Sequence, residues 1–132
     1  MKSIIVMLLC LFISACGMKK NWDIKNMDVA EELQPQENIT MELIEQTNES
    51  LTVEFKNNDN DPWIYGEVFS IQVLVDNEWY IVPSEMAFNL VGYNLYPNES
   101  VTKTYDISSY GTLPSGTYRL VASNLAVEFI IE

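Results

Sequence analysis

Cys16 is the residue whose type and position point to the most specific chemistry in this chain. It closes the run Ile13-Ser14-Ala15-Cys16, and Lys2 and an apolar stretch over residues 4–13 precede it. A charged start, a short apolar core and small residues before a cleavage point are typical of a secretory signal, and this core is too short to span a bilayer as a helix. The sequence therefore predicts a signal that is cleaved at Cys16.

This signal resembles that of bacterial lipoproteins, whose lipobox is an aliphatic residue, two small residues and a cysteine. Residues 13–16 match at every position. The resemblance implies that the Cys16 sulfur receives a diacylglyceryl group, that residues 1–15 are removed, and that Cys16 becomes the mature N-terminus. The protein would then be lipid-anchored at the extracytoplasmic face of the cell membrane. The alternative is an ordinary secretory signal that ends near a cysteine.

Catalytic chemistry is restricted by residue types that the sequence lacks. It contains no histidine, and its two cysteines are Cys16 and Cys10, which lies within the expected signal. A chain without histidine cannot build a triad with a His base, and it lacks the commonest zinc and copper ligand. We therefore expect no enzyme and no cofactor. A hydrolase would need several acidic side chains that converge in one pocket, which a sequence pattern cannot reveal.

The formal net charge of −12 is strongly one-sided. Beyond residue 37 the cations are Lys56, Lys103 and Arg119. Such a surface repels nucleic acid and anionic lipid headgroups, so we expect no nucleic-acid partner. Lys103 shares a strand face with Val101 and Tyr105, which predicts an inward-pointing lysine on an edge strand. Arg119 is expected to pair with a carboxylate.

The chain changes character near residue 38. Residues 16–37 are polar, contain Pro35 and show no sustained period, so we expect a flexible, lipidated tether. From residue 38 onward, apolar and polar residues alternate with a period of two, and Asp76-Asn77 predicts a tight hairpin turn. Residues 84–96 are expected to form a short strand and a loop folded over an edge. Strands are predicted at residues 39–43, 51–56, 69–75, 79–82, 101–107, 118–122 and 126–131.

This pattern predicts an all-β domain over residues 38–132, an antiparallel β-sandwich of about seven strands. Several motifs resemble, in their order, a bacterial immunoglobulin-like domain found in secreted and lipid-anchored proteins of low-GC Gram-positive bacteria. They are Trp63-x-Tyr65-Gly66-x-x-Phe69, Glu78-Trp79-Tyr80-x-Val82-Pro83, Leu95-x-Pro97-x-Glu99-Ser100 and Leu113-Pro114-x-Gly116-x-Tyr118-Arg119-Leu120.

The resemblance implies a fold and transfers no active site. It implies that Tyr118 is the corner tyrosine of such a sandwich, with a hydrogen bond to the backbone a few residues upstream. It also implies that Trp79 is the buried core tryptophan, here without a disulfide against it.

Two groups of residues are candidates for binding. Aromatic residues of the apolar segment 84–96, namely Phe88, Tyr93 and Tyr96, are the candidate partner contacts, with packing on the sandwich as the alternative. Asp59 and Asp61 could offer oxygen ligands to calcium. Their loop lacks the glycine and the bidentate glutamate of a calcium loop, so a solvated turn is preferred and no metal is expected.

These observations together predict a monomeric, non-catalytic module. It would be held to the membrane by its N-terminal lipid and would bind a protein or a cell-wall component. The alternative is a proteinase inhibitor, or an accessory subunit of an envelope complex, whose aromatic segment 84–96 enters a cleft.

Overall fold

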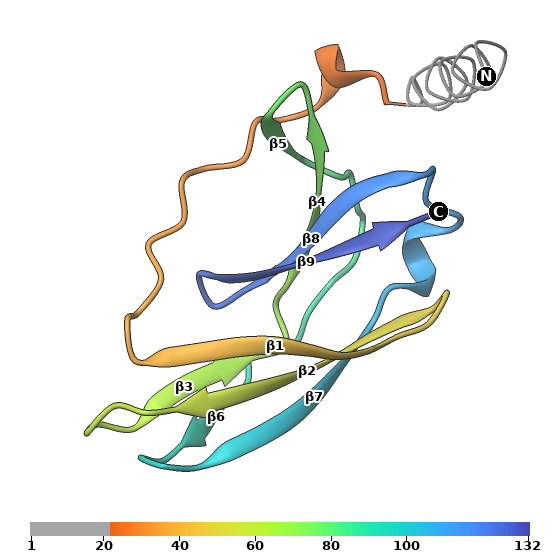
Figure 1. The fold of residues 1–132 in the computed structure, drawn as a ribbon. Coiled ribbons are helices and arrows are strands. Elements are labelled where there is room, and N and C mark those ends of the chain that lie inside the picture. Colours follow the sequence, from red (N-terminus) through yellow and green to blue (C-terminus); the bar gives the residue numbers. More distant parts are fainter. Residues whose placement is uncertain (1–21) are drawn as a thin grey trace, which may run out of the picture.

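The computed structural model describes residues 22–132, so Cys16, the lipobox and the expected signal lie outside the described residues. The described chain is built from strands and two short 3₁₀ helices (Figure 1). The elements in order are η1 (Ile24–Asn26), β1 (Ile39–Gln46), β2 (Ser50–Asn57), β3 (Trp63–Gly66), β4 (Ser70–Val75), β5 (Glu78–Ile81), β6 (Gly92–Leu95), β7 (Ser100–Asp106), η2 (Ser108–Tyr110), β8 (Gly116–Ala122) and β9 (Leu125–Ile131).

The strands form two sheets and a separate ribbon, and every pairing is antiparallel. One sheet has the order β1-β2-β7, the other has the order β5-β4-β8-β9, and β3 pairs with β6 alone. The ribbon lies at the lower end of the molecule in Figure 1, beside β2 and β7. The predicted antiparallel β-sandwich is confirmed.

Alternation of side chains explains why these segments become strands. In β2, Leu51, Val53 and Phe55 are all fully buried, while the residues between them are only partly buried. Successive side chains of a strand point to opposite faces, so one face of β2 lines the core. The predicted turn at Asp76-Asn77 is confirmed, because both residues have positive φ angles of 51° and 66°. That is the geometry of a two-residue hairpin loop whose twist matches its strands.

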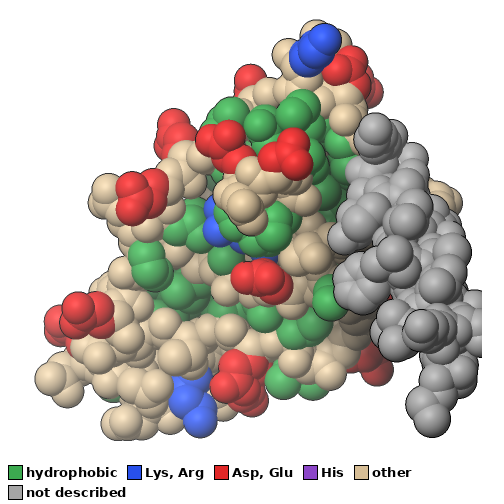
Figure 2. Space-filling model, turned by 45° about the horizontal axis from the view of Figure 1, so that its top comes forward, with side chains coloured by type: hydrophobic (Ala, Val, Ile, Leu, Met, Phe, Trp, Pro, Cys, Tyr) green, Lys and Arg blue, Asp and Glu red, His purple; other side chains and the backbone are tan. Residues whose placement is uncertain are grey.

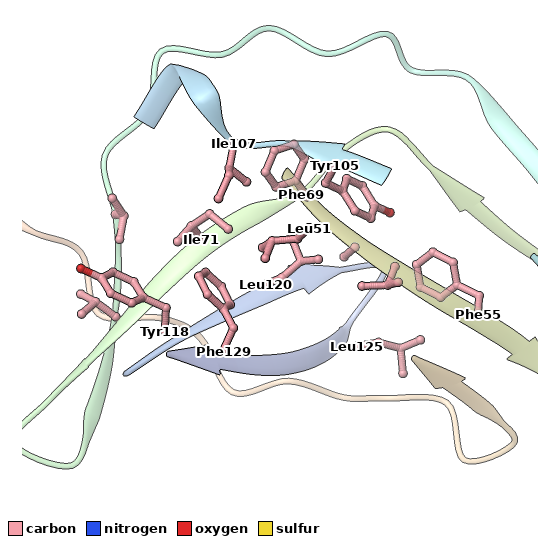
Figure 3. Close-up of a cluster of buried hydrophobic side chains, with 14 of the residues drawn as sticks. Leu51, Phe55, Phe69, Ile71, Tyr105, Ile107, Tyr118, Leu120, Leu125 and Phe129 are labelled. Atoms are coloured by element: carbon pink, nitrogen blue, oxygen red, sulfur yellow. The ribbon is translucent and has the colours of Figure 1, made fainter. Parts of the chain in front are cut away.

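The core lies between the two sheets, and aromatic side chains fill much of it (Figure 3). Phe69 and Tyr105 lie with ring centroids 5.0 Å apart, and Tyr118 stacks on Phe129 at 5.6 Å. The Tyr118 hydroxyl donates a hydrogen bond to the Pro114 carbonyl oxygen. The expected role of Tyr118 as a corner tyrosine is therefore confirmed.

The expected role of Trp79 is wrong. The buried tryptophan is Trp63 in β3, which is 8% exposed and packs on Phe55 at 5.2 Å. Trp79 lies on the outer edge strand β5 and is only partly buried. The reason is register: Trp79 pairs with Leu74, whereas the neighbouring pair, Val73 and Tyr80, carries the inward-facing Val73.

Residues 22–30, here named the N-terminal arm, differ from the expectation of a free tether. The Trp22 Nε1–H donates to the Tyr118 hydroxyl at 3.2 Å, and the Trp22 and Tyr118 rings meet edge-on. Further along, Val29 forms a β-bridge with Tyr80 of β5. These contacts pair residues far apart in sequence, which local composition does not encode. Residues 16–21 lie outside the described residues.

Candidate functional site

Most of the exposed large hydrophobic side chains in residues 22–132 come from the β3–β6 ribbon and the chain beside it. Leu90 is 89% exposed, Ile64 is 63% exposed and Tyr96 is 53% exposed. Exposed apolar side chains gathered in one region mark interaction sites more often than scattered ones do. We name this set the ribbon surface; its members are Ile64, Val68, Leu90, Val91, Tyr93 and Tyr96. Tyr93 lies at the rim of the inner face of the ribbon, because it pairs with Tyr65 on the face that carries Trp63 and Leu95, and Ile64 lies on the outer face.

The pleat of the ribbon decides which of its side chains reach solvent. Trp63 and Leu95 form one register pair and are both buried, so this face of the ribbon packs on the core. Ile64 therefore points away from the core. A Cβ atom at Gly92 would lie 2.9 Å from the Ile64 side chain, so glycine is needed there for Ile64 to lie across the partner strand.

The three predicted contact residues have different environments. Phe88 is partly buried and meets the Phe69 ring edge-on at 5.4 Å, so it is anchored in the domain. Tyr93 is 38% exposed, packs on Tyr65 at 5.3 Å, and donates its hydroxyl hydrogen bond to Glu67 at 3.0 Å. Tyr96 is exposed, and its backbone N–H donates to the Glu99 carboxylate at 2.8 Å. Tyr96 is thus the most accessible of the three.

An ion pair ties the ribbon surface to β7. Lys103 donates to the Glu67 carboxylate, and its ammonium lies 5.8 Å from the Tyr93 ring centroid and 5.6 Å from the Tyr105 ring centroid. Lys103 lies on the inner face of the edge strand β7, as predicted. Hydrogen bonds from Lys103 and from Tyr93 lower the pKa of Glu67, so its carboxylate stays charged and holds Tyr93 in place.

A shallow pocket of about 320 Å³ opens beside the ribbon surface. Aromatic and thioether side chains form its walls, and the carboxylates of Glu67 and Asp106 lie at its lining. The Tyr105 hydroxyl is buried and has no hydrogen-bond partner within residues 22–132, and burial raises the pKa of this hydroxyl. A pocket whose lining combines apolar side chains with carboxylates suits a long side chain that is apolar along its stem and cationic at its tip.

The aspartates considered for calcium serve the β2–β3 loop. Asp59 accepts hydrogen bonds from its neighbour's N–H at 2.8 Å and from the Gln36 amide at 3.4 Å. Asp61 is exposed, and its carbonyl oxygen accepts from the buried Asn57 amide at 3.0 Å. Asn57 also donates to the Leu95 carbonyl oxygen at 2.9 Å and thereby joins the loop to the ribbon. In the part of the chain that is described, no group of three or more potential metal-ligating side chains occurs.

Arg119 has a different partner from the one expected. Its Nε–H donates to the Gln72 side-chain oxygen at 2.6 Å, and its guanidinium lies 4.4 Å from the Trp79 ring centroid. Within residues 22–132 the ion pair found is Lys103–Glu67, so the predicted carboxylate pair of Arg119 is wrong. Glu128 pairs with Arg119 across the β8–β9 ladder, and its negative charge favours the protonated guanidinium without a hydrogen bond between the two side chains.

Sequence reasoning selected Phe88, Tyr93 and Tyr96 and missed the other members of the ribbon surface. The signal for Ile64 was present, because it alternates with Trp63 and Tyr65. Leu90 and Val91 are adjacent apolar residues within the apolar segment 84–96. The Glu67–Lys103 pair joins positions that are far apart in sequence, so no local pattern could identify it.

Two antiparallel sheets packed face to face, with a corner tyrosine entering β8, define an immunoglobulin-like sandwich. The family model described as the bacterial Ig-like domain matches residues 32–129, and the chain belongs to this family. The comparison with curated proteins finds no match to this chain. Across residues 22–132, none of the helices has the length and apolar character needed to cross a membrane.

Proposed function

We propose that the protein is a monomeric, non-catalytic module of the cell envelope that is lipid-anchored through Cys16 and binds a protein partner with its ribbon surface. The observation that carries the proposal is the concentration of exposed hydrophobic side chains on and beside the β3–β6 ribbon. Membership of the bacterial Ig-like domain family supports a binding role, because function in such modules comes from surfaces added to a shared scaffold.

The composition of the ribbon surface favours a protein over a wall polymer. It combines two tyrosines with aliphatic residues, and Leu90 is almost wholly exposed. Protein interfaces are enriched in aromatic side chains and depleted of charge at their centre. The exposed aliphatic side chains Ile64, Val68 and Leu90 offer no hydrogen bonds to the hydroxyl groups of a sugar polymer.

The negative charge of the chain indicates what kind of protein would bind to it. The chain carries 19 Asp and Glu against 7 Lys and Arg, and Figure 2 shows acidic side chains spread over the visible face with few basic ones among them. The pocket beside the ribbon surface adds Glu67 and Asp106. A partner with exposed apolar residues and a basic rim complements this surface, and attraction between opposite charges would speed their association.

The proposed anchor rests on residues 13–16, which fit a lipobox at every position. Lipidation would place the module on the outer face of the membrane. An acyl chain contributes about 0.8 kcal/mol per buried CH₂ group, so a diacyl anchor holds a protein to the bilayer without a spanning helix.

Capture of the partner from the native envelope, with the full-length protein as bait, tests the binding proposal. The test variant is Leu90→Ser with Tyr96→Ser, because both side chains are exposed. We expect capture to fall at least about tenfold, as for residues central to an interface. The matched control is Ile130→Ser on β9, which is 62% exposed and lies outside the ribbon surface; its capture should be unchanged.

The outcomes separate the candidate functions. Equal capture by the test and control variants contradicts the assignment of the ribbon surface. If no protein is captured and the protein sediments with purified cell-wall polymer, the partner is a wall component. Inhibition of a captured protease by the protein would favour the inhibitor alternative.

A further inference from the structure

The N-terminal arm contacts the domain at both of its ends. At its start, the Trp22 indole donates to the Tyr118 hydroxyl at 3.2 Å. At its end, the Ala30 N–H donates to the Trp79 carbonyl oxygen at 2.9 Å, and the Ile81 N–H donates to the Asp28 carbonyl oxygen at 2.9 Å. The arm thereby extends the edge of β5 as a short extra strand. Met27, between these ends, packs against the hydrophobic core.

Docking of the arm shortens the connection between the lipid and the domain. If residues 16–37 were free, the chain from Cys16 to the first strand would reach about 75 Å when fully extended. With Trp22 held on Tyr118, the connection from Cys16 reaches about 20 Å. The domain then lies close to the bilayer, and the point of attachment on the domain is fixed.

The position of the arm determines which end of the sandwich is attached. Figure 1 places η1 and the turn between β4 and β5 at one end of the molecule, and the β3–β6 ribbon at the opposite end. The attachment point and the ribbon surface therefore lie at opposite ends of the sandwich.

Charge at the attached end limits how closely this end approaches the membrane. Asp23, Asp28, Asp76 and Glu78 are exposed there, and among residues 22–132 Lys25 is the basic residue beside them. A negative surface is repelled by anionic headgroups within about one Debye length, which is about 8 Å at physiological ionic strength. The lipid draws this end toward the bilayer while its carboxylates resist contact.

We infer that the docked N-terminal arm fixes the orientation of the lipid-anchored domain, so that the β4–β5 end faces the bilayer and the ribbon surface points away from it. This inference rests on the proposed lipidation of Cys16. It explains how a short connection leaves the ribbon surface open to a partner. A free tether would let the domain turn in every direction.

Reaction of single introduced cysteines with a lipid-bound probe tests the orientation. The lipidated full-length protein is reconstituted in phosphatidylcholine and phosphatidylglycerol vesicles that contain a phospholipid with a maleimide headgroup. One variant carries Glu78→Cys at the β4–β5 end, and the other carries Asn60→Cys in the loop between β2 and β3 at the ribbon end; both positions are exposed. Rates with a soluble maleimide correct for the intrinsic reactivity of each thiol.

We expect the cysteine at residue 78 to react with the lipid probe at least about fivefold faster than the cysteine at residue 60, because effective concentration falls as the distance to be spanned grows. Undocking the arm with Trp22→Ala and Ala30→Pro should bring the ratio to one or below, because the freed chain then joins the domain at Asn38, whose side chain bonds to Asp59 beside residue 60. The proline removes the N–H that bonds to Trp79. The matched control combines Lys25→Ala with Glu32→Pro. Neither the Lys25 side chain nor the Glu32 N–H makes a hydrogen bond within residues 22–132.

Four results decide the inference. A high ratio that the undocking variant abolishes and the control keeps supports it. A ratio near one in the protein with an intact arm overturns it, and so does a high ratio that undocking leaves unchanged; in both cases vesicle binding shows that the lipid anchor still holds. A protein that carries no acyl mass and does not bind vesicles overturns both the inference and the proposed anchor.

Discussion

The Tyr118 hydroxyl makes the two hydrogen bonds that most directly join the arm, the corner and the core. It donates to the Pro114 carbonyl oxygen at 2.5 Å and accepts from the Trp22 Nε1–H at 3.2 Å, while the rest of the side chain is fully buried. Tyr118→Phe removes this one oxygen and keeps the ring that stacks on Phe129. The substitution therefore isolates the hydroxyl from the packing.

The expected cost follows from the two bonds. A hydrogen bond contributes about 0.5–1.5 kcal/mol net, and a buried partner left without its bond costs about 1–3 kcal/mol. The Pro114 carbonyl loses its donor in a partly buried site, so we expect Tyr118→Phe to lower the free energy of unfolding by about 2 kcal/mol. For a domain of this size, that loss corresponds to a drop in Tm of about 8–16 °C.

Urea unfolding followed by far-UV circular dichroism measures this change. The control is Tyr80→Phe, whose hydroxyl bonds only to the exposed Glu78 at 3.4 Å, and it should change stability by less than about 0.5 kcal/mol. A double-mutant cycle with Trp22→Phe, which removes the indole N–H, should show coupling with Tyr118→Phe. If Tyr118→Phe unfolds within about 0.5 kcal/mol of the unmodified protein, neither the corner nor the docked arm stabilises the fold as argued.

Two further predictions concern the ribbon. The pKa of Glu67 is lowered from its ordinary value of 4.5, so its stabilising effect is present above that pH and is lost as the pH falls through the lowered value. Glu67→Gln should therefore destabilise the domain by about 1 kcal/mol at pH 7 and by almost nothing at pH 3, and an unchanged difference between these urea titrations would refute the ion pair. Asn57→Ala leaves the buried carbonyl of Leu95 without its donor and should lower stability by about 2–4 kcal/mol, whereas Asp61→Ala should stay within about 0.5 kcal/mol in the same assay.

Period-two alternation predicted the strands wherever one face is buried along five or more residues. In β2, three fully buried residues alternate with partly buried ones, and that regularity is visible in the sequence. The hairpin turns also depend on local sequence. The residues of Asp76-Asn77 and of Ser123-Asn124 all have positive φ angles, and each pair joins neighbouring strands. These features depend on the residues themselves and their nearest neighbours.

The features that the sequence did not reveal depend on pairing between distant segments. β3 and β6 have four residues each, which is too short for a period to emerge. Trp63 and Trp79 both lie near an isoleucine and a tyrosine in strands of four residues. Only the pairing of these strands with distant segments places Trp63 in the core and Trp79 at an outer edge. The docked arm depends on Trp22 meeting Tyr118, and the Lys103–Glu67 pair depends on β7 lying beside the ribbon.

The ribbon has inner side chains that belong to the core and outer side chains that do not, and this division suits it to binding. Its inner residues, Trp63 and Leu95, belong to the core and resist substitution. Its outer residues contact solvent, so changes to Ile64 or Leu90 alter the surface with little effect on folding. The Glu67–Lys103 pair ties the chain that follows β3 to β7 of the three-stranded sheet. A chain built in this way can change its partner by changing exposed side chains while the two sheets remain as they are.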